Sequence, residues 1–493
     1  MKARKEVKEI LEKYRAIWAL NHASQLMRWD LETYMPQEGA AARGASLSEL
    51  SILMQKFTLE LQPYVNSANK LKDLTDEEKG LLRVIGRRID YYSKVPSELI
   101  SQIQKATTEA RVVWRNARAK SDFSLFKPHL ERLLELKKEE GEKLADGKDA
   151  YDALLDQSEE GLSSSIMDSI FSTLIPSLKQ LVSKVAASKY FPGKHELEDV
   201  KYDVNAMAAL NSDILSLLKM PASRFRMDVS THPFTISFDV NDVRITTRYE
   251  GKDFKSSMYS TIHESGHAIY ELQVSQELSY TPLARGVSSG FHESQSRFWE
   301  NVIGRSSGFI ELIQPYIKKH LSFTSKYDSE SLFRYVNTVR PSLIRVDADE
   351  LTYNFHIALR YHVEKKLFKD EAKVSEVPEL WNDTIEEYLG IRPKNDAEGC
   401  LQDIHWSHGG FASFPNYTVG NVIAGMCYQR ISNEIDMSDI IAKGKLQNIK
   451  DWLRDNIHQY GAVYSPQELQ KKVFGKLYDP KPLLQYLSSK FSA

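Results

Sequence analysis

The sequence has few cysteines and few glycines for its length. Two cysteines in 493 residues, Cys400 and Cys427, are too few to cross-link the chain, which argues against a disulfide scaffold and favours a reducing, intracellular location. The 23 glycines fall below the average share, which is roughly 7%. We find no low-complexity tract and no internal repeat, so a folded protein with a large core is expected.

The sequence also lacks a charge excess and a long apolar run. Its 65 basic and 67 acidic residues leave a net charge of −2, which gives no electrostatic footprint for nucleic acid or an anionic membrane. No segment approaches the roughly 20 apolar residues of a membrane span. The N-terminus mixes both charge signs and lacks the apolar run of a signal peptide. We therefore expect a soluble, cytoplasmic protein that binds neither nucleic acid nor membrane.

Apolar residues at the spacing of an α-helix face recur along much of the chain. Leu11, Tyr14, Ile17 and Trp18 follow this spacing. The candidate breaks between helices are Met35-Pro36, residues 190–194, Met220-Pro221 and Arg392-Pro393. None of them is a long polar linker. The pattern predicts a mainly α fold, a single large helical body around a cleft.

One segment has a different period. Apolar residues alternate with polar ones at Phe234, Ile236, Phe238 and Val240, and again at Val243, Ile245, Thr247 and Tyr249 after Asn241-Asp242. A period of two on both sides of an Asn-Asp turn predicts a β-hairpin. Because the hairpin ends shortly before a histidine motif, we expect the hairpin and that motif to be neighbours in space.

The motif His263-Glu264-Ser265-Gly266-His267 is the strongest chemical signal. The residues from Ser256-Ser257 onward predict a capped helix. On that helix His263 and His267 are four residues apart and share a face, so their imidazoles can converge on one metal ion. Glu264 lies to the side, where it can reach a metal-activated water. The plain alternative is a surface helix with two unrelated histidines.

A catalytic metal site needs a third protein ligand. The short spacing HExxHxxGxxH is absent. A second helix, capped near Ser289 and ending near Gly304, is predicted downstream, and it carries Glu293. We expect Glu293 to be the third ligand. His292 competes for this role, and Glu293 could instead be an ordinary acidic residue of a first helical turn.

The chain resembles the carboxypeptidase Taq family of thermostable zinc carboxypeptidases over nearly its whole length. The motifs that carry the resemblance are, in order, Trp29-Asp30…Thr33…Met35-Pro36…Gly39…Arg43, His232-Pro233-Phe234, Asp242-Val243-Arg244-Ile245-Thr246, His263-Glu264-Ser265-Gly266-His267, His292-Glu293-Ser294-Gln295, Ile344-Arg345-Val346-Asp347-Ala348-Asp349 and Gly399-Cys400-Leu401-Gln402-Asp403-Ile404-His405-Trp406. The ordered set is more specific than any single motif.

The resemblance implies a mostly α-helical fold with a deep groove, a homodimer, and release of single amino acids from peptide C-termini. We expect a single metallocarboxypeptidase domain over residues 1–493. Its N-terminal half, about residues 1–220, would cover the groove, and its catalytic half would be about residues 221–493.

On this hypothesis each site residue has an expected role. His263, His267 and Glu293 bind Zn²⁺, with Co²⁺ as the alternative, and Glu264 is the general base. His405 and Tyr417 are the candidates for stabilising the oxyanion, because a downstream histidine and tyrosine serve related two-helix zinc peptidases.

An arginine is expected to read the free carboxylate of the peptide, because its planar fork grips both oxygens. Arg345 is the first candidate and Arg244, on the predicted hairpin, is the second. Arg345 could instead form an ordinary helix pair with Asp349, four residues on. Cys400 is expected to be a small buried side chain and not a ligand.

Two other functions stay open at this point. An oligopeptidase that cuts internal bonds would use the same metal chemistry without a carboxylate reader. A peptide-binding scaffold that has lost activity is less favoured, because a purely structural metal site has no need of Glu264 beside its ligands.

Overall fold

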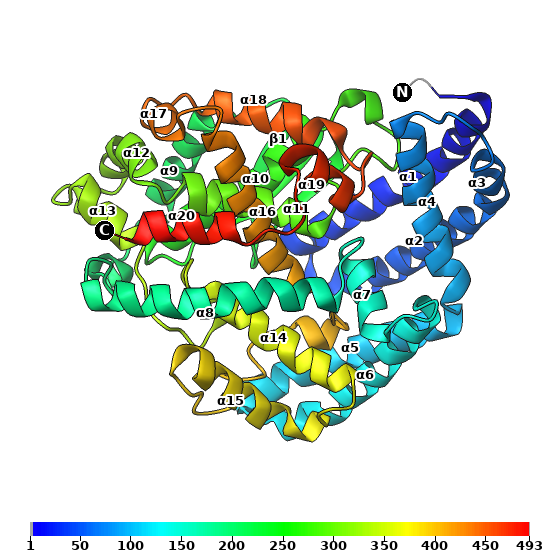
Figure 1. Ribbon diagram of the computed structural model, residues 1–493, viewed down its shortest axis with the longest axis horizontal. Coiled ribbons are helices and arrows are strands. Elements are labelled where there is room, and N and C mark those ends of the chain that lie inside the picture. The colour runs from blue at the N-terminus through cyan, green and yellow to red at the C-terminus, as the bar shows by residue number, and fades with distance from the viewer. Residues whose placement is uncertain (1–2, 493) are drawn as a thin grey trace. The chain divides into compact units, whose positions relative to one another are not determined.

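Helices make up most of the structure, a computed structural model that describes residues 3–492 (Figure 1). The chain folds into two compact, interleaved units. The first unit runs to residue 93 and also contains residues 196–336 and 427–477. The second contains residues 94–195 and 337–426 and continues from residue 478. The mainly α prediction is confirmed, while the expected single domain with halves that meet near residue 220 stays a prediction.

The first unit holds the histidine motif and the sheet. Its helices are α1 (Lys5–Thr33), α2 (Ala40–Glu60), α3 (Gln62–Ala68), α4 (Asp76–Lys94), α9 (Val204–Leu217), α10 (Phe254–Gln273), α11 (Ser289–Arg297), α12 (Ser307–His320), α13 (Ser329–Val336), α17 (Met437–Ala442), α18 (Leu446–Asn456) and α19 (Pro466–Phe474). In α1, Tyr14 and Ile17 are buried as their spacing predicts, and they join a core with α4 that includes Leu81 and Ile85. Each fully buried aliphatic side chain contributes about 1.5–3 kcal/mol.

The sheet has three strands in the order β1-β3-β2, with β1 at Phe225–Val229, β2 at Thr235–Asp239 and β3 at Asp242–Thr247. Strands β2 and β3 pair antiparallel, which confirms the predicted hairpin. Strand β1 pairs parallel to β3 and was not predicted. Val243 and Ile245 of β3 pack against Ala268 and Leu272 of α10. This packing places the sheet directly beside the metal motif helix, as expected.

The second unit is helical. It contains α5 (Ser97–Lys120), α6 (Phe123–Leu144), α7 (Ala150–Ser158), α8 (Ser164–Ser188), α14 (Tyr353–Phe368), α15 (Val377–Leu389) and α20 (Lys481–Phe491), while α16 (Pro415–Ser432) continues from the second unit into the first. Helices α5 and α6 lie side by side (Figure 1). The side chain of Trp114 on α5 donates to the carbonyl oxygen of Leu401 at 3.0 Å, which ties α5 to the segment that precedes His405.

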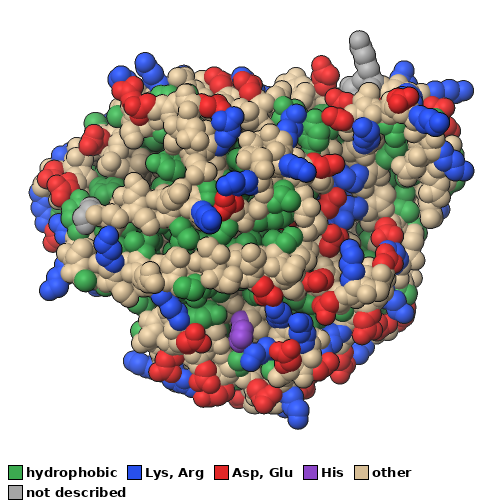
Figure 2. Space-filling view, viewed as in Figure 1, with side chains coloured by type: hydrophobic (Ala, Val, Ile, Leu, Met, Phe, Trp, Pro, Cys, Tyr) green, Lys and Arg blue, Asp and Glu red, His purple; other side chains and the backbone are tan. Residues whose placement is uncertain are grey.

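The predicted breaks all fall between helices. Met35-Pro36 follows α1, residues 190–194 follow α8, Met220-Pro221 follows α9 and Arg392-Pro393 follows α15. Figure 2 shows basic and acidic side chains interspersed over the visible face, in keeping with the balanced composition. Among the described residues, every helix is too short or too polar to cross a membrane.

Candidate active site

Helix α10 carries the histidine motif and is anchored to the sheet. Thr261 donates to the side chain of Thr247 on β3 at 3.0 Å. The helix begins at Phe254, two residues earlier than the predicted cap at Ser256. The preceding residue, Asp253, has a φ of 50° and makes no capping hydrogen bond, because its carboxylate accepts from Tyr335 instead.

Helix α11 carries Glu293 and begins at Ser289. Its N-cap is Ser288, one residue before the predicted position, and the Ser288 hydroxyl accepts from the Phe291 amide at 3.2 Å. After Arg297 the α-helix gives way to a π-helix, Phe298–Ile303, which precedes Gly304. Expecting one continuous α-helix was therefore wrong. π-Turns are often found at functional sites, and this one carries Glu300 toward the histidines.

Helices α10 and α11 approach closely at Gly266. A Cβ atom at this position would lie 2.5 Å from the carbonyl oxygen of Gln295 and 2.7 Å from the Cα of Ser296. Both neighbours are helix backbone, which cannot move aside as a flexible side chain can. Only glycine therefore permits this separation between the helix of His263 and His267 and the helix of Glu293.

The three predicted ligands come together. One donor atom from each of His263, His267 and Glu293 lies within 4.8 Å of the other two. Oε2 of Glu293 is 3.8 Å from Nε2 of His263 and 3.5 Å from Nε2 of His267. Two imidazole nitrogens and a carboxylate oxygen form a common donor set for a catalytic divalent ion.

The remaining atoms of two ligands are already hydrogen-bonded. Nδ1 of His263 lies 2.8 Å from Oε2 of Glu300, and Oε1 of Glu293 accepts from Nε of Arg297 at 2.7 Å. These partners orient the ligands and leave Nε2 of His263 and Oε2 of Glu293 toward the common centre. Such outer contacts are typical of a metal site. The residues therefore fit a divalent metal ion.

His267 is held by a chain of two further residues. Its Nδ1 lies 2.7 Å from Nδ1 of His292, and Nε2 of His292 lies 2.7 Å from Oε1 of Glu271. If His267 donates from Nδ1, its Nε2 is free to bind a metal, and His292 donates from Nε2 to Glu271. Both ring nitrogens of His292 are then occupied, which disfavours His292 as the third ligand.

The field around the ligands keeps the carboxylates ionised. Burial alone raises the pKa of Glu293 and of Glu300, but the charges of Arg297 and His263 outweigh it and hold both pKa values well below the usual range. Burial also opposes ionisation of Glu271, whose pKa is nevertheless lowered by its contact with His292. Anionic carboxylates suit both metal binding and the orientation of imidazoles.

Glu264 lies beside the ligands without joining their cluster. Its Oε2 accepts from the hydroxyl of Thr235 on β2 at 2.6 Å, and the same hydroxyl contacts the Glu264 carbonyl oxygen at 3.0 Å. Oε1 of Glu264 has no hydrogen-bond partner among the described residues. The sheet therefore fixes the carboxylate and leaves one oxygen able to accept a proton.

Arg244 on β3 is fully engaged by its surroundings. Its Nε and Nη2 donate to the two carboxylate oxygens of Asp242 at 2.9 and 2.8 Å. The guanidinium also lies 4.7 Å from the ring centres of Trp29 and Phe238. This arrangement is typical of a structural arginine, because the fork that would grip a substrate carboxylate already holds one.

The second unit contains a buried cluster of two arginines and one aspartate. Arg345 donates to Asp403 through Nη2 at 2.9 Å and to the Tyr353 hydroxyl at 3.0 Å. Arg360 donates to Asp403 through Nε at 2.6 Å and to Gln402 at 2.9 Å. Within this cluster two guanidiniums face one carboxylate, so it carries one net positive charge.

The alternative pairing of Arg345 with Asp349 is wrong. Arg345 begins a short 3-10 helix, Arg345–Asp347, and α14 begins only at Tyr353, so the two residues are not on one α-helix. The carboxylate of Asp349 instead accepts from the amides of Leu351 and Thr352.

His405 and Tyr417 lie together in the second unit. Nε2 of His405 is 3.4 Å from the Tyr417 hydroxyl, and its Nδ1 is 3.9 Å from Asp403. Burial lowers the pKa of His405 to about 4 and outweighs the opposing charge of Asp403. The ring is therefore neutral near pH 7. Cys400 is buried, as expected.

Several residues around the site were missed in the sequence. Glu300 is seven residues after Glu293 and Glu271 four after His267, which are helix-face spacings that could have pointed to them. Thr235 gave no local signal, and Asp403, although it stands in a quoted motif, gave no sign of its partner, because both reach their partners from distant parts of the chain.

Comparison with known proteins agrees with the site. Residues 9–491 match the family model described as carboxypeptidase Taq (M32) metallopeptidase. The chain is 44% identical to thermostable carboxypeptidase 1 of Pyrococcus furiosus and 34% identical to carboxypeptidase 1 of Bacillus subtilis, over 98% of both chains in each case. A solved structure of Pyrococcus furiosus carboxypeptidase superposes with a TM-score of 0.98 over 99% of both chains at 44% identity. Trypanosoma cruzi metallocarboxypeptidase 1 superposes with a TM-score of 0.95 at 33% identity, over 99% of this chain and 100% of that one.

The helical fold and its histidine–glutamate cluster define a metallopeptidase. This chain belongs to the carboxypeptidase Taq (M32) family. The resemblance seen in the sequence motifs is thereby confirmed. Metallocarboxypeptidase activity, and not internal cleavage, is the function that the family and its curated members support.

Proposed function

We propose that this enzyme removes single amino acids with broad specificity from the free C-termini of peptides, with one zinc ion held by His263, His267 and Glu293. Cobalt is the alternative ion. The observation that carries this proposal is the convergence of the three donor atoms within 4.8 Å. When bound, a divalent ion supplies Lewis acidity, which makes water more acidic and polarises the scissile carbonyl.

Glu264 is the proposed general base. Its Oε1 accepts a proton from the attacking water and later delivers that proton to the leaving amine. The contact between Oε2 and Thr235 supports this role, because it fixes the carboxylate while Oε1 stays available. Proton transfer of this kind contributes roughly 10²–10⁴-fold to the rate.

Arg345 is proposed to bind the free C-terminal carboxylate of the peptide substrate. The net positive charge that it shares with Arg360 and Asp403 supports this role, because a buried unbalanced charge favours binding of an anion. Asp403 and Tyr353 also hold the guanidinium in a fixed orientation. For Arg244, the other candidate, the occupied fork leaves only a supporting role on β3.

His405 and Tyr417 are proposed to stabilise the developing oxyanion. A neutral imidazole and a phenol are both hydrogen-bond donors, and the neutral state of His405 near pH 7 suits this task. We also propose that the enzyme is a homodimer, as the family resemblance implies. Light scattering on the eluted protein would show the mass of two chains.

The central proposal is tested by mass spectrometry of a peptide digest over time. We expect a ladder of successive one-residue losses from the C-terminus and no cleavage of the same peptide with an amidated C-terminus. Internal fragments from the amidated peptide would contradict the proposal. The Glu264→Gln enzyme is the matched control, because a contaminating peptidase would still produce the ladder in its preparation.

A further inference from the structure

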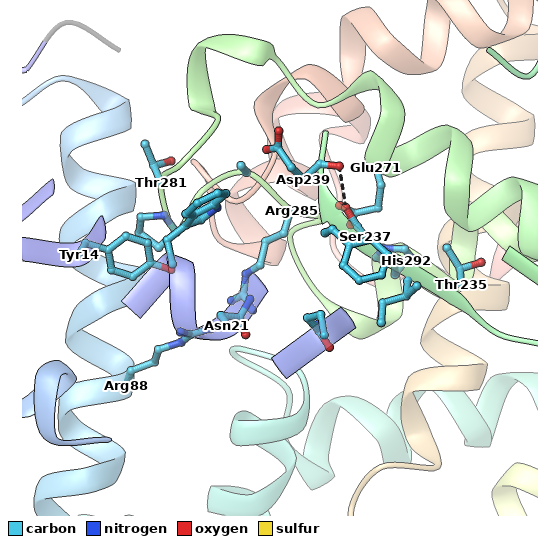
Figure 3. Close-up of a pocket in the computed structure, with 16 residues that line it drawn as sticks. Tyr14, Asn21, Arg88, Thr235, Ser237, Asp239, Glu271, Thr281, Arg285 and His292 are labelled. Atoms are coloured by element: carbon cyan, nitrogen blue, oxygen red, sulfur yellow. Dashed lines mark hydrogen bonds and ion pairs between the residues drawn. The ribbon is translucent and has the colours of Figure 1, made fainter. Parts of the chain in front are cut away.

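A cavity of about 380 Å³ lies within the first unit, beside the metal ligands (Figure 3). Its walls come from α1, α4, the length of β2 and the loop that precedes α11. Ligand pockets commonly have volumes of roughly 300–1,000 Å³. This cavity is therefore large enough for part of a peptide.

One end of the cavity is lined by residues that contact the catalytic residues. Thr235 and His292 line it, and these residues hydrogen-bond to Glu264 and His267. From Thr235 the cavity follows β2 as far as Asp239. Four residue steps along a strand span about 13 Å. The cavity thus leads away from the catalytic residues over several residue lengths.

Two arginines extend into this cavity. Figure 3 shows the side chain of Arg285 pointing away from His292 and Thr235, toward Asn21 and Arg88. Neither Arg88 nor Arg285 forms a hydrogen bond or ion pair through its side chain with another described residue. Two guanidiniums in one cavity without a carboxylate partner repel each other, and a bound anion would relieve this repulsion.

The acids of the cavity wall form no ion pair with either arginine, and the charge of Glu271 offsets only part of the effect of burial and of Arg88 on Arg285. Glu271 is engaged by His292 and by the amide of Gly286. Asp239 forms no ion pair with either arginine. Burial and then the charge of Arg88 lower the pKa of Arg285 to about 10, so Arg285 stays protonated at neutral pH. The cavity therefore offers two cationic forks to a ligand.

The position of the pair along the cavity indicates which part of a peptide it meets. In a carboxypeptidase only one residue follows the scissile bond, and an extended residue spans at most about 3.6 Å. A cavity that runs several residue lengths from the catalytic residues is therefore filled by residues that precede the bond. Carboxylate is the anion that peptides carry on such residues, and it matches the arginine fork.

We propose that Arg88 and Arg285 bind the carboxylate side chain of an aspartate or glutamate that precedes the scissile bond, so that the enzyme favours peptides with an acidic residue there. The proposal rests on the proposed carboxypeptidase function. It concerns a specificity site distinct from the one proposed for the terminal carboxylate at Arg345.

The test is a set of N-blocked peptides in which one glutamate occupies, in turn, each of the four positions before the terminal residue. Each peptide has a twin with glutamine at that position. We expect kcat/KM of the wild-type enzyme to favour glutamate by about tenfold at one position, mainly through KM, since a charged hydrogen bond contributes on this scale. The Arg285→Gln and Arg88→Gln enzymes should lower this ratio toward one, and Arg285→Lys should keep part of it.

Arg454→Gln is the matched control, because Arg454 is an exposed arginine of the first unit that pairs with Asp451 and Asp455 on α18. This variant should keep the wild-type ratio. Equal rates for glutamate and glutamine peptides at every position in the wild-type enzyme would overturn the proposal. An equal loss on both twins in Arg285→Gln would also overturn it, because it would mean that Arg285 reads the terminal carboxylate.

A binding experiment tests the Arg88 and Arg285 site independently of the proposed carboxypeptidase activity. The affinity of each labelled twin for the Glu264→Gln enzyme is measured by fluorescence anisotropy, which needs no turnover. We expect the glutamate twin to bind more tightly than the glutamine twin, and this difference to be lost when Arg285→Gln is added. That result supports the site even if the wild-type enzyme leaves the peptides uncut. Equal binding of the twins, with normal ladders from the wild-type enzyme, rejects the site alone.

Discussion

Nδ1 of His267 lies 2.7 Å from Nδ1 of His292, so one imidazole positions another within the metal site. The second imidazole is held in turn by Glu271 at 2.7 Å. This arrangement differs from that of His263, which contacts the carboxylate of Glu300 directly. The two histidine ligands are therefore oriented by different chemistry.

The first prediction concerns His292. His292→Phe removes the hydrogen-bond partner of His267 while keeping a ring of similar size, so zinc affinity should fall by about 10–100-fold. Competition with a chromophoric chelator measures this affinity without any turnover. His320→Phe is the control, because His320 pairs with Asp213 outside the metal ligand cluster. Unchanged zinc affinity in His292→Phe would show that His267 is oriented without it.

The second prediction separates metal binding from proton transfer. Glu264→Gln should keep one zinc ion per chain and lose about 10²–10⁴-fold in kcat, because the amide cannot accept the proton. Metal content is measured by plasma emission and kcat by release of the terminal residue. Thr235→Val should cause a smaller loss, since it removes only the contact that fixes Glu264. Near-wild-type turnover in Glu264→Gln would refute the assignment of the base.

The third prediction concerns Arg345. Arg345→Gln should reduce the preference for free over amidated C-termini by about tenfold or more, since a charged hydrogen bond is lost. Arg345→Lys keeps the charge but loses the fork, and should retain part of the preference. The measurement is the ratio of kcat/KM for the two forms of one peptide. Arg392→Gln, a change in an exposed ion-pair cluster, is the control. A preserved ratio in Arg345→Gln would assign the terminal carboxylate to another residue.

The fourth prediction concerns the buried carboxyl of Glu364. Burial raises its pKa from 4.5 to about 7, although Trp406, Ala412 and Tyr151 donate to it. The folded state then binds this proton more tightly than the unfolded state. Stability from this group is present below pH 4.5 and is lost as the pH rises toward about 7, by about 3 kcal/mol in all.

The melting temperatures of the wild type and Glu364→Gln, compared at about pH 5 and about pH 8, test this effect. The wild type should lose stability relative to the glutamine variant at the higher pH, because glutamine does not titrate. Glu139→Gln, a change at an exposed residue of the same unit, should show no such trend. A difference between wild type and Glu364→Gln that stays constant with pH would mean that Glu364 ionises at an ordinary pKa.

Local patterns predicted the features that lie within one or two elements. The spacing of His263 and His267 fixed a shared helix face, and alternation around Asn241-Asp242 indicated the hairpin. Strand β1 was missed although Phe225, Met227 and Val229 alternate with polar residues, because this five-residue run is short and is followed by no turn to a neighbouring strand. The parallel pairing of β1 with β3 also joins segments that are not consecutive, so no tight turn in the sequence indicates it.

The environment of the arginines could not be read from spacing. Asp349 stands four residues after Arg345, yet the partner is Asp403, 58 residues away, because the chain at Arg345 is not α-helical. Arg285 illustrates the opposite case. Its importance comes from the lack of an ion-pair partner among the described residues, which is a property of the folded chain alone.

The interleaving of the two units constrains how the protein is made. The first unit needs residues up to 477, and the second needs α20, in which Lys490 pairs with Glu350 and Phe491 packs against Phe191. Domains usually fold as they leave the ribosome, N-terminal part first. Here the first unit has all its segments only once residue 477 has been made, and the second only once α20 has been made. The apolar helix faces of the earlier segments must therefore stay without their partners until these segments are made, and a chain that stops before residue 427 would have two incomplete cores.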